Sequence, residues 1–391
     1  MIFVTFLRSG GFISMNKSII RYVLGHILII EGALMLLPCL VALFYQERNG
    51  IYFLIVAALC EVIGFLMSRK KPKSYLIYTK EGCVTTALSW ILLSIFGAIP
   101  FVLTGEIPSF TDALFETISG FTTTGASILS DVESLSHCSI FWRSFTHWIG
   151  GMGVLVFLLA IVPLSGGSNI NLMKAESPGP TVGKLVPKVR YTARILYIIY
   201  FSLTLIQIAL LLFGGMNLFD SVTISFGTAG TGGFSIKNDG MASYSLYIKW
   251  VVTIFMTLFG VSFNAYYILL FSRDKKAFLI DEVKWYFIII LTATAIITIR
   301  IIGISGSFVT ALTDSAFQVS SIITTTGYST TDFDLWDETS KAILVLLMFI
   351  GACSGSTGGG IKVSRFLILG KAIRKELNSK EKEMAETILN Y

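Results

Sequence analysis

The feature that most constrains this chain is a series of long apolar stretches separated by charged or glycine-rich connections. Stretches of about 20 apolar residues, the length that crosses the ~30 Å hydrocarbon core of a bilayer, lie near 19–45, 51–67, 84–104, 142–164, 191–214, 249–271, 283–304 and 341–362. Composition agrees, because 54% of the residues are hydrophobic and only 14% are charged. These values exclude a soluble enzyme, a disordered chain and a secreted disulfide scaffold. We therefore predict an all-α polytopic membrane protein.

The connections between these stretches alternate in charge. Basic residues gather at 69–80, 174–194, 273–284 and 371–382, whereas acidic residues gather at 47, 106–133, 220–239 and 314–338. Cytoplasmic connections carry the excess of lysine and arginine, so both termini are predicted to be cytoplasmic. The same pattern accounts for the net charge of +6 without a nucleic-acid partner. The five cysteines show no metal-ligand or redox spacing, and we expect no covalently bound cofactor.

Three of the acidic connections share one pattern, which makes the chain an internal repeat. The segments are FTDALFETISGFTTTGAS (110–127), LFDSVTISFGTAGTGGFS (218–235) and LTDSAFQVSSIITTTGYS (312–329). Each begins with an acid-containing amphipathic stretch and ends in a cluster of threonine and glycine. Placing Gly125, Gly232 and Gly327 in register gives spacings of 107 and 95 residues. Each repeat is predicted to be a span, a short helix with a loop, and a second span, with the first two spans outside the repeat.

These short segments are predicted to enter the membrane and return, because about ten helical residues are too few to cross it. Non-helical backbone at membrane depth must line protein or a watery cavity, and glycine allows its carbonyls to turn toward an axis. Rings of carbonyl oxygens replace the hydration shell of a potassium ion, and the negative end of each short helix favours a cation. No lysine or arginine interrupts the three clusters. The clusters are therefore predicted to line a cation pore.

In these motifs the sequence resembles the Trk/Ktr/HKT superfamily of potassium transporters, most closely the bacterial Trk-type membrane subunit. The resemblance is carried by SGFTTTGAS, TAGTGGFS and ITTTGYSTTDF, with FWRSFTHWIGGMGVLV (141–156) and GACSGSTGGGIKV (351–363). It implies a pseudo-fourfold pore of potassium-channel-like units with one filter glycine in each, here Gly125, Gly232 and Gly327. Glycine at all three points to potassium, since serine at the first filter position accompanies sodium preference in the plant branch. The filter residues carried over, the only ones expected to bind the metal ion, are Thr123, Thr124, Gly125, Ala126, Gly230, Thr231, Gly232, Gly233, Thr325, Thr326, Gly327 and Tyr328.

The superfamily pattern requires four units, and this sequence contains three. We interpret residues 1–15 as a leader, 16–78 as two N-terminal transmembrane helices, 79–170, 171–275 and 276–370 as pore repeats, and 371–391 as a cytoplasmic tail. We expect either a fragment whose fourth unit lies downstream or a short form that closes its pore with another chain, and in both cases no transport by this chain alone. The leader lacks a signal-peptide pattern, and translation is expected to start at Met15.

The glycine-rich stretch of the last span is not predicted to bind a nucleotide. Gly355 and Gly360 fit G-x-x-x-x-G, but Ile361-Lys362-Val363 follows instead of Lys and then Ser or Thr. Three consecutive glycines disfavour a helix, so the span is predicted to break into a flexible loop beneath the filter. The resemblance makes this loop the gate, with gate residues Gly355, Ser356, Thr357, Gly358, Gly359, Gly360 and Lys362. Lys362 is either functional at membrane depth or snorkels to the cytoplasmic edge.

Three charges near the repeats lead to hypotheses about pairing. Glu116 lies in the first short helix and Arg143 at the start of the following span. Because buried charges tend to pair, we expect an ion pair that braces the first filter, with independent exposure to the outer vestibule as the alternative. Arg300 is expected to snorkel, with pairing to Asp314 as the alternative.

The leading functional interpretation is potassium uptake across a bacterial plasma membrane, through a glycine-lined filter gated by the loop in the last span. One alternative is a sodium or mixed monovalent cation transporter. Another is a non-conducting regulatory subunit or inactive fragment. An enzyme is not expected, because the spans show no histidine clustered with carboxylates. The resemblance implies a homodimer in the lipid bilayer that docks a cytosolic nucleotide-binding regulatory subunit.

Overall fold

A computed structural model describes residues 15–389 except 73, 76, 152, 154–188 and 272–279. Residues 1–14 of the leader and most of the connection between the fourth and fifth predicted spans therefore lie outside the described residues. Within them the chain is helical apart from connections and one pair of two-residue strands. The predicted all-α architecture is confirmed.

The helices form an N-terminal group followed by three units of similar order. The N-terminal group is α2 (Lys17–Leu34), α3 (Leu36–Tyr45) and α4 (Gly50–Ser68). The first unit contains α5 (Thr79–Thr104), α6 (Phe110–Phe121) and α7 (His137–Gly151). The second contains α10 (Val189–Phe213), α11 (Leu218–Ala229), α12 (Leu246–Phe259) and α13 (Phe263–Phe271). The third contains α14 (Asp281–Ser305), α15 (Phe308–Ile323), η2 (Phe333–Leu335), α16 (Glu338–Phe349), β1 (Ile350–Gly351), β2 (Ile361–Lys362) and α17 (Val363–Leu389).

Five helical spans among the described residues are long and apolar enough to cross a membrane. They are Lys17–Tyr45, Gly50–Ser68, Lys80–Thr104, Arg194–Phe213 and Asp281–Ser305, which match five of the predicted spans. The first is interrupted at Met35, where α2 ends four residues before Pro38, because the proline ring clashes with the carbonyl at that distance. Their outward side chains are apolar, with Leu43, Phe213 and Ile299 among the most exposed, as a lipid-facing surface requires.

The other three predicted spans are corrected or only partly described. The span predicted at 249–271 is two helices, α12 and α13, which meet at an angle of 89°. The span predicted at 341–362 is helical only as far as Phe349 and then forms the expected interruption. The span predicted at 142–164 is seen as α7 up to Gly151, and the rest falls outside the described residues. Hydropathy alone does not report the break between α12 and α13, since apolar residues continue through it, whereas the glycines at 358–360 predicted the break in the last span.

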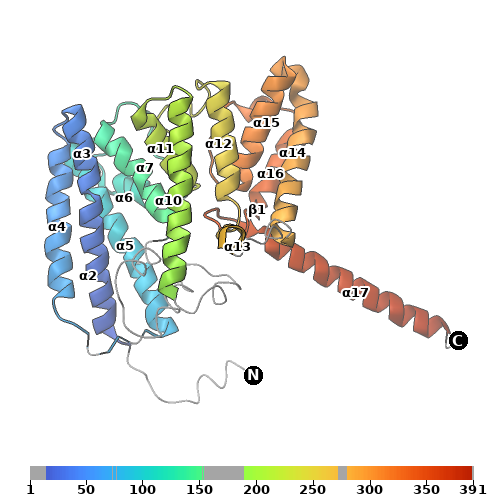
Figure 1. The fold of residues 1–391 in the computed structure, drawn as a ribbon, viewed down its shortest axis with the longest axis horizontal. Helices are drawn as coiled ribbons and strands as arrows, with labels where there is room; N and C mark the ends of the chain where they lie inside the picture. Colours follow the sequence, from blue (N-terminus) through green and yellow to red (C-terminus); the bar gives the residue numbers. More distant parts are fainter. Residues whose placement is uncertain are drawn as a thin grey trace.

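The long helices stand side by side, and α17 projects away from the rest (Figure 1). Each short helix packs against the long helix that precedes it, α6 on α5, α11 on α10 and α15 on α14. One buried apolar cluster joins the N-terminal helices to the first unit, and a second joins the second and third units. This packing fixes α6, α11 and α15 in equivalent places, which positions the segments that follow them.

Candidate functional site

The three short helices begin at polar caps. Ser109 Oγ accepts from the amide of Asp112 at 3.4 Å, and Asn217 Oδ1 accepts from the amide of Asp220 at 2.7 Å. Ser307 caps α15 in the same way through the amide of Val309. These caps satisfy amides that a helix leaves unpaired at its start. The opposite, electronegative end of each helix faces the segment that follows it.

We call the residues that follow the helices the first (122–127), second (230–235) and third (324–329) turn segments. They share one backbone conformation: Thr123, Thr231 and Thr325 have φ of 54°, 52° and 60°, and Gly125, Gly233 and Gly327 have φ of 74°, 75° and 88°. A β-branched residue with positive φ is strained and needs support from its surroundings. Three threonines with the same strained conformation indicate one shared local design.

Hydrogen bonds confirm the register of the turn segments. The amides of Thr124, Gly232 and Thr326 donate to carbonyls five residues earlier, at 2.9, 3.0 and 2.8 Å. Gly125 therefore corresponds to Gly233 and Gly327, and the repeats are spaced by 108 and 94 residues. The sequence-based register, which used Gly232, is wrong by one residue. The second repeat has Gly232 where the others have Thr124 and Thr326, so either glycine of GTGG fits the equivalent position by residue type.

The three turn segments lie against one another in chain order. A Cβ at Gly125 would overlap the carbonyl oxygen of Gly232, and a Cβ at Gly233 would overlap the carbonyl oxygen of Thr326. At Gly327 a Cβ would meet no described atom within 4 Å. Only glycine permits such close contact of two backbones. The sequence-predicted filter residues of the three repeats are thus brought together.

The expected ion pair between Glu116 and Arg143 is present and buried, and it also links the first turn segment to the second. Arg143 Nε donates to Glu116 Oε1 at 2.5 Å. Glu116 also accepts from Ser127 Oγ at 2.9 Å and from the amide of Ile128 at 3.1 Å. On the other side, Arg143 donates to the carbonyl of Ser235 at 2.8 Å. The pair therefore has hydrogen-bond partners on two repeats.

The third repeat uses a neutral residue in the place of Glu116. Gln318 Nε2 donates to Ser329 Oγ at 2.7 Å and to the carbonyl of Thr331 at 3.2 Å. Gln318 and Ser329 each lie 202 residues beyond Glu116 and Ser127. Sequence reasoning missed Gln318, although the repeat offset taken from Gly125 and Gly327 would have found it.

His147 supports the second turn segment from behind, a role that sequence reasoning also missed. Its side chain is completely buried in α7, and its ring stacks on Phe234 with centroids 4.1 Å apart. The amide of Phe234 donates to Nδ1 at 3.5 Å. A Cβ at Gly232 would overlap the imidazole. The histidine therefore explains why glycine stands at 232 beside the equivalent glycine at 233.

The interrupted part of the last span forms a closed loop, residues 350–362, beneath the third turn segment. β1 and β2 pair in parallel at its neck, Ile350 with Ile361 and Gly351 with Lys362. The amide of Gly359 donates to Thr325 Oγ1 at 2.7 Å. Lys362 Nζ turns inward and bonds the carbonyls of Gly358 and Gly359. Lys362 thus stabilises the loop that contains it, and the predicted gate residues contact the third turn segment directly.

The loop is also bonded to the break between α12 and α13. The amide of Phe263 donates to the carbonyl of Gly355, and the amide of Cys353 donates to the carbonyl of Gly260, both at 3.0 Å. Thr357 Oγ1 donates to the carbonyl of Phe259 at 3.3 Å. Backbone groups that the helix break releases are satisfied in this way. The breaks in the second and third repeats therefore support each other.

Arg300 does not pair with Asp314, nor does it only snorkel. It donates to Asp337, the N-cap of α16, at 3.0 Å. The hydroxyl of Ser340, against an opposing effect of burial, and the guanidinium of Arg300 lower the pKa of Asp337 to about 2. This contact joins α14 to α16 at the end of the third unit.

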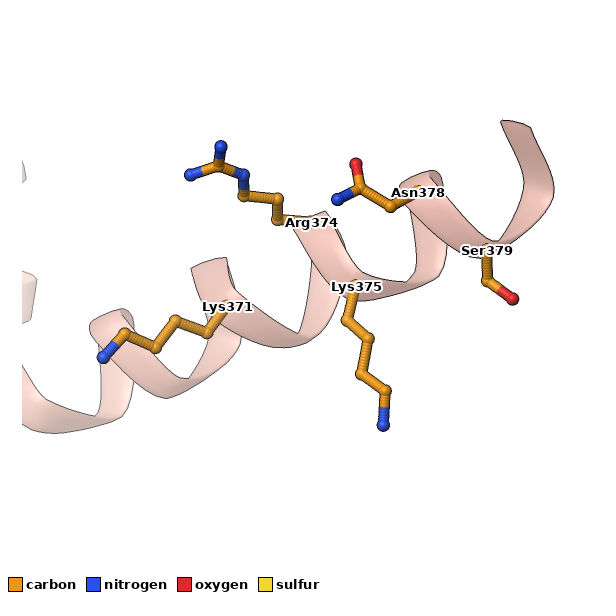
Figure 2. A pocket seen from close by; sticks show the side chains of 5 residues that line it. All are labelled: Lys371, Arg374, Lys375, Asn378 and Ser379. Carbon is orange, nitrogen blue, oxygen red and sulfur yellow. The ribbon is translucent and has the colours of Figure 1, made fainter. Parts of the chain in front are cut away.

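A hollow elsewhere on the chain is basic. It is lined by Lys371, Arg374, Lys375, Asn378 and Ser379, all on the projecting helix α17 (Figure 2). Lys371 Nζ is paired with Asp281 at 2.8 Å. Three cationic side chains are unsuited to holding a cation, so the turn segments remain the candidate functional site.

Comparison with known proteins gives a consistent result. A family model described as TrkH, cation transport protein, matches residues 48–390. The Trk system potassium uptake protein TrkH of Salmonella typhimurium is 36% identical over 374 residues, covering 93% of this chain and 77% of that relative. Its counterpart in Escherichia coli K12 is 34% identical over 372 residues, with the same coverage.

A solved structure agrees with the sequence relatives. The crystal structure of the potassium transporter TrkH from Vibrio parahaemolyticus matches with a TM-score of 0.82 and 29% identity, covering 93% of this chain and 76% of that one. The family model and the relatives above cover most of the chain, including all three turn segments and the loop. The chain therefore belongs to the TrkH family of cation transport proteins.

Proposed function

We propose that this protein takes up potassium through a path lined by the three turn segments, with the loop at 350–362 as its gate. The observation that carries the proposal is the repeated backbone conformation at Thr123, Thr231 and Thr325. The three turn segments lie against one another at the negative ends of short helices, with their backbone carbonyls close together. Carbonyl oxygens in this arrangement replace the hydration shell of a potassium ion.

Family membership supports the transport part of this proposal. The chain is a multi-pass membrane protein of a cation transport family rather than an enzyme. Relatives in Salmonella and Escherichia coli are called potassium uptake proteins. A uniformly neutral lining agrees with cation passage, since none of the three turn segments contains lysine or arginine.

By register, the proposed ion-binding residues shift by one position in the second repeat. Thr231, Gly232, Gly233 and Phe234 correspond to Thr123–Ala126 and to Thr325–Tyr328. Gly230 then corresponds to Thr122 and Thr324, one residue before the strained threonine. The carbonyls of these residues are proposed to face the ion.

The setting of the protein is proposed from the charge pattern and from the family. Basic connections on one side support cytoplasmic termini, and the bacterial relatives support a bacterial plasma membrane. The relatives' designation as part of a Trk system supports association with further components. We propose a homodimer bound to a cytosolic nucleotide-binding subunit.

Ion flux tests the proposal. The protein is purified from cells that express it from its own locus with its flanking DNA, so that any further unit or partner chain encoded there is included. It is reconstituted in liposomes that contain an internal potassium or sodium indicator. Potassium flux well above sodium flux is expected, because glycine occupies all three equivalent filter positions. Equal fluxes would favour the mixed-cation alternative, and no flux of either ion would favour a non-conducting subunit. Liposomes without protein give the background leak.

A further inference from the structure

One carboxylate binds both sides of the loop. Glu282 Oε1 accepts from the amide of Ser354 at 2.6 Å and from the amide of Ser364 at 3.2 Å. Ser354 lies in the first half of the loop, and Ser364 lies just after its second half, in the first turn of α17. A single side chain of α14 therefore closes the loop from outside, in addition to the strand pairing at its neck.

The other bonds between the loop and its surroundings are of a weaker kind. Thr325 offers a neutral hydroxyl, and the contacts to Gly260 and Phe263 join neutral backbone groups. A hydrogen bond to an ionised acceptor is roughly twice as strong as one between neutral groups. Among the residues that the structure describes, Glu282 is the carboxylate that accepts hydrogen bonds at the loop, and it accepts from two donors at once.

The position of Glu282 suits a control point. It lies in the first turn of α14 and is half-buried, at the cytoplasmic end by the charge pattern. Its neighbour Asp281 pairs with Lys371 on α17. A movement of the start of α14 relative to α17 would therefore pull on both bonds of Glu282.

We propose that Glu282 is a latch that holds the loop closed, and that opening requires both of its bonds to break. Glu282 is a positioning residue, since it contacts the loop rather than the ion path. The inference rests on the proposed function only in assigning the loop to the ion path. Opening of the loop can be measured without measuring transport.

The loop contains its own reporter. Cys353 is completely buried in the closed loop, next to Ser354. Cys60, in α4 and far along the chain, is also completely buried and reports on general loosening of the fold. Two single-cysteine proteins are made by replacing the other four of the five cysteines. Each is labelled in membranes with a membrane-permeant maleimide, and the labelling rate follows the population of the open form.

Glu282→Ala is expected to raise the labelling rate of Cys353 by about tenfold or more, since bonds to a charged group are lost. Glu282→Gln keeps the shape but not the charge, so a smaller increase is expected. Asp281→Asn is the matched control, because it makes the same change of charge one residue away and has no bond to the loop. Cys60 labelling is expected to stay unchanged in all three.

Two results would overturn the proposal. In the first, Cys353 is labelled at the same rate in both Glu282 variants as in Asp281→Asn. In the second, the Glu282 variants accelerate the labelling of Cys353 and of Cys60 equally. If Glu282→Ala does not reach the membrane, Glu282→Gln carries the test. Potassium flux is measured on the same variants. If Cys353 labelling is faster in the Glu282 variants but neither the unmodified protein nor any variant conducts potassium, the latch is supported and the proposed function is contradicted. If the proteins conduct potassium but the labelling rate is unchanged, only the latch is contradicted.

Discussion

Arg143 and Glu116 form an ion pair that is almost fully removed from solvent, with side chains 3% and 1% exposed. Glu116 holds Ser127 and Ile128 of the first repeat, while Arg143 holds the carbonyl of Ser235 in the second. The Arg143 guanidinium also lies 3.5 Å from the centre of the Phe234 ring. The pair therefore fixes the exits of two turn segments relative to each other.

Removing one partner of this pair should be strongly destabilising. Glu116→Ala leaves Arg143 buried without its counter-charge, at a cost of about 3–5 kcal/mol. Gln318→Ala, the equivalent change in the third repeat, removes neutral hydrogen bonds and should cost about 1–3 kcal/mol. Thermal unfolding of the detergent-purified proteins measures both, and equal losses would show that the charge adds nothing.

The corrected register predicts which glycines tolerate a methyl group. Gly125→Ala and Gly233→Ala should prevent folding, because the new Cβ overlaps a neighbouring carbonyl. Gly327→Ala meets open space but retains a positive φ, so a cost of about 1–3 kcal/mol is expected. Gly303→Ala in α14, with open space and helical φ, is the control and should be neutral or stabilising. Yield of monodisperse protein is the measurement, and normal yield of Gly233→Ala would contradict the register.

Two buried tyrosines join successive repeats in the same way. Tyr200 Oη donates to the carbonyl of Trp148 at 2.9 Å, and Tyr286 Oη donates to the carbonyl of Thr257 at 3.1 Å. Tyr200→Phe and Tyr286→Phe should each cost about 0.5–1.5 kcal/mol, and the two costs should be similar. Tyr52→Phe, on the exposed side of α4, is the control. The unfolding temperatures of the variants are the measurement. A loss of stability in only one of the two variants would contradict equivalent roles for the two tyrosines.

Low pH should weaken the contact between Arg300 and Asp337. The pKa of Asp337 is lowered from 3.8 to about 2, so its stabilising effect is present above about pH 4 and is lost as the pH falls through about 2. The difference in unfolding temperature between the unmodified protein and Asp337→Asn should therefore shrink over this range. Glu338→Gln, whose carboxylate is highly exposed, serves as the control. A difference independent of pH would show that the carboxylate charge is not the cause.

Much of the fold follows from local sequence patterns. Long apolar stretches must form helices in lipid because a backbone there has no water to bond, which identifies α2, α4, α5, α10 and α14. Capping residues before Asp112 and Asp220 mark where the short helices start. The threonine and glycine clusters mark the segments that follow, since they interrupt the helical pattern in each repeat.

The break between α12 and α13 and the register were beyond the reach of these patterns. At the break between α12 and α13, Tyr286 and Thr324 from the third repeat occupy the space that a side chain at Gly260 would need. The positive φ of Gly233 identifies it as the equivalent glycine, and residue 232 is also glycine because His147, from another repeat, fills the space beside it. Glu282 gave no signal at all, because its two partners lie more than 70 residues away in sequence.

The sequence by itself determined the class of the protein, its repeats and the residue types that line the candidate site, since these depend on hydropathy, helix caps and glycine. Only the tertiary structure decided which glycine is equivalent to which, how Arg143 and Glu116 join two repeats, and what closes the loop. The physical reason is that strained backbone and buried charge persist only where distant groups support them. Those groups come together only when the helices pack.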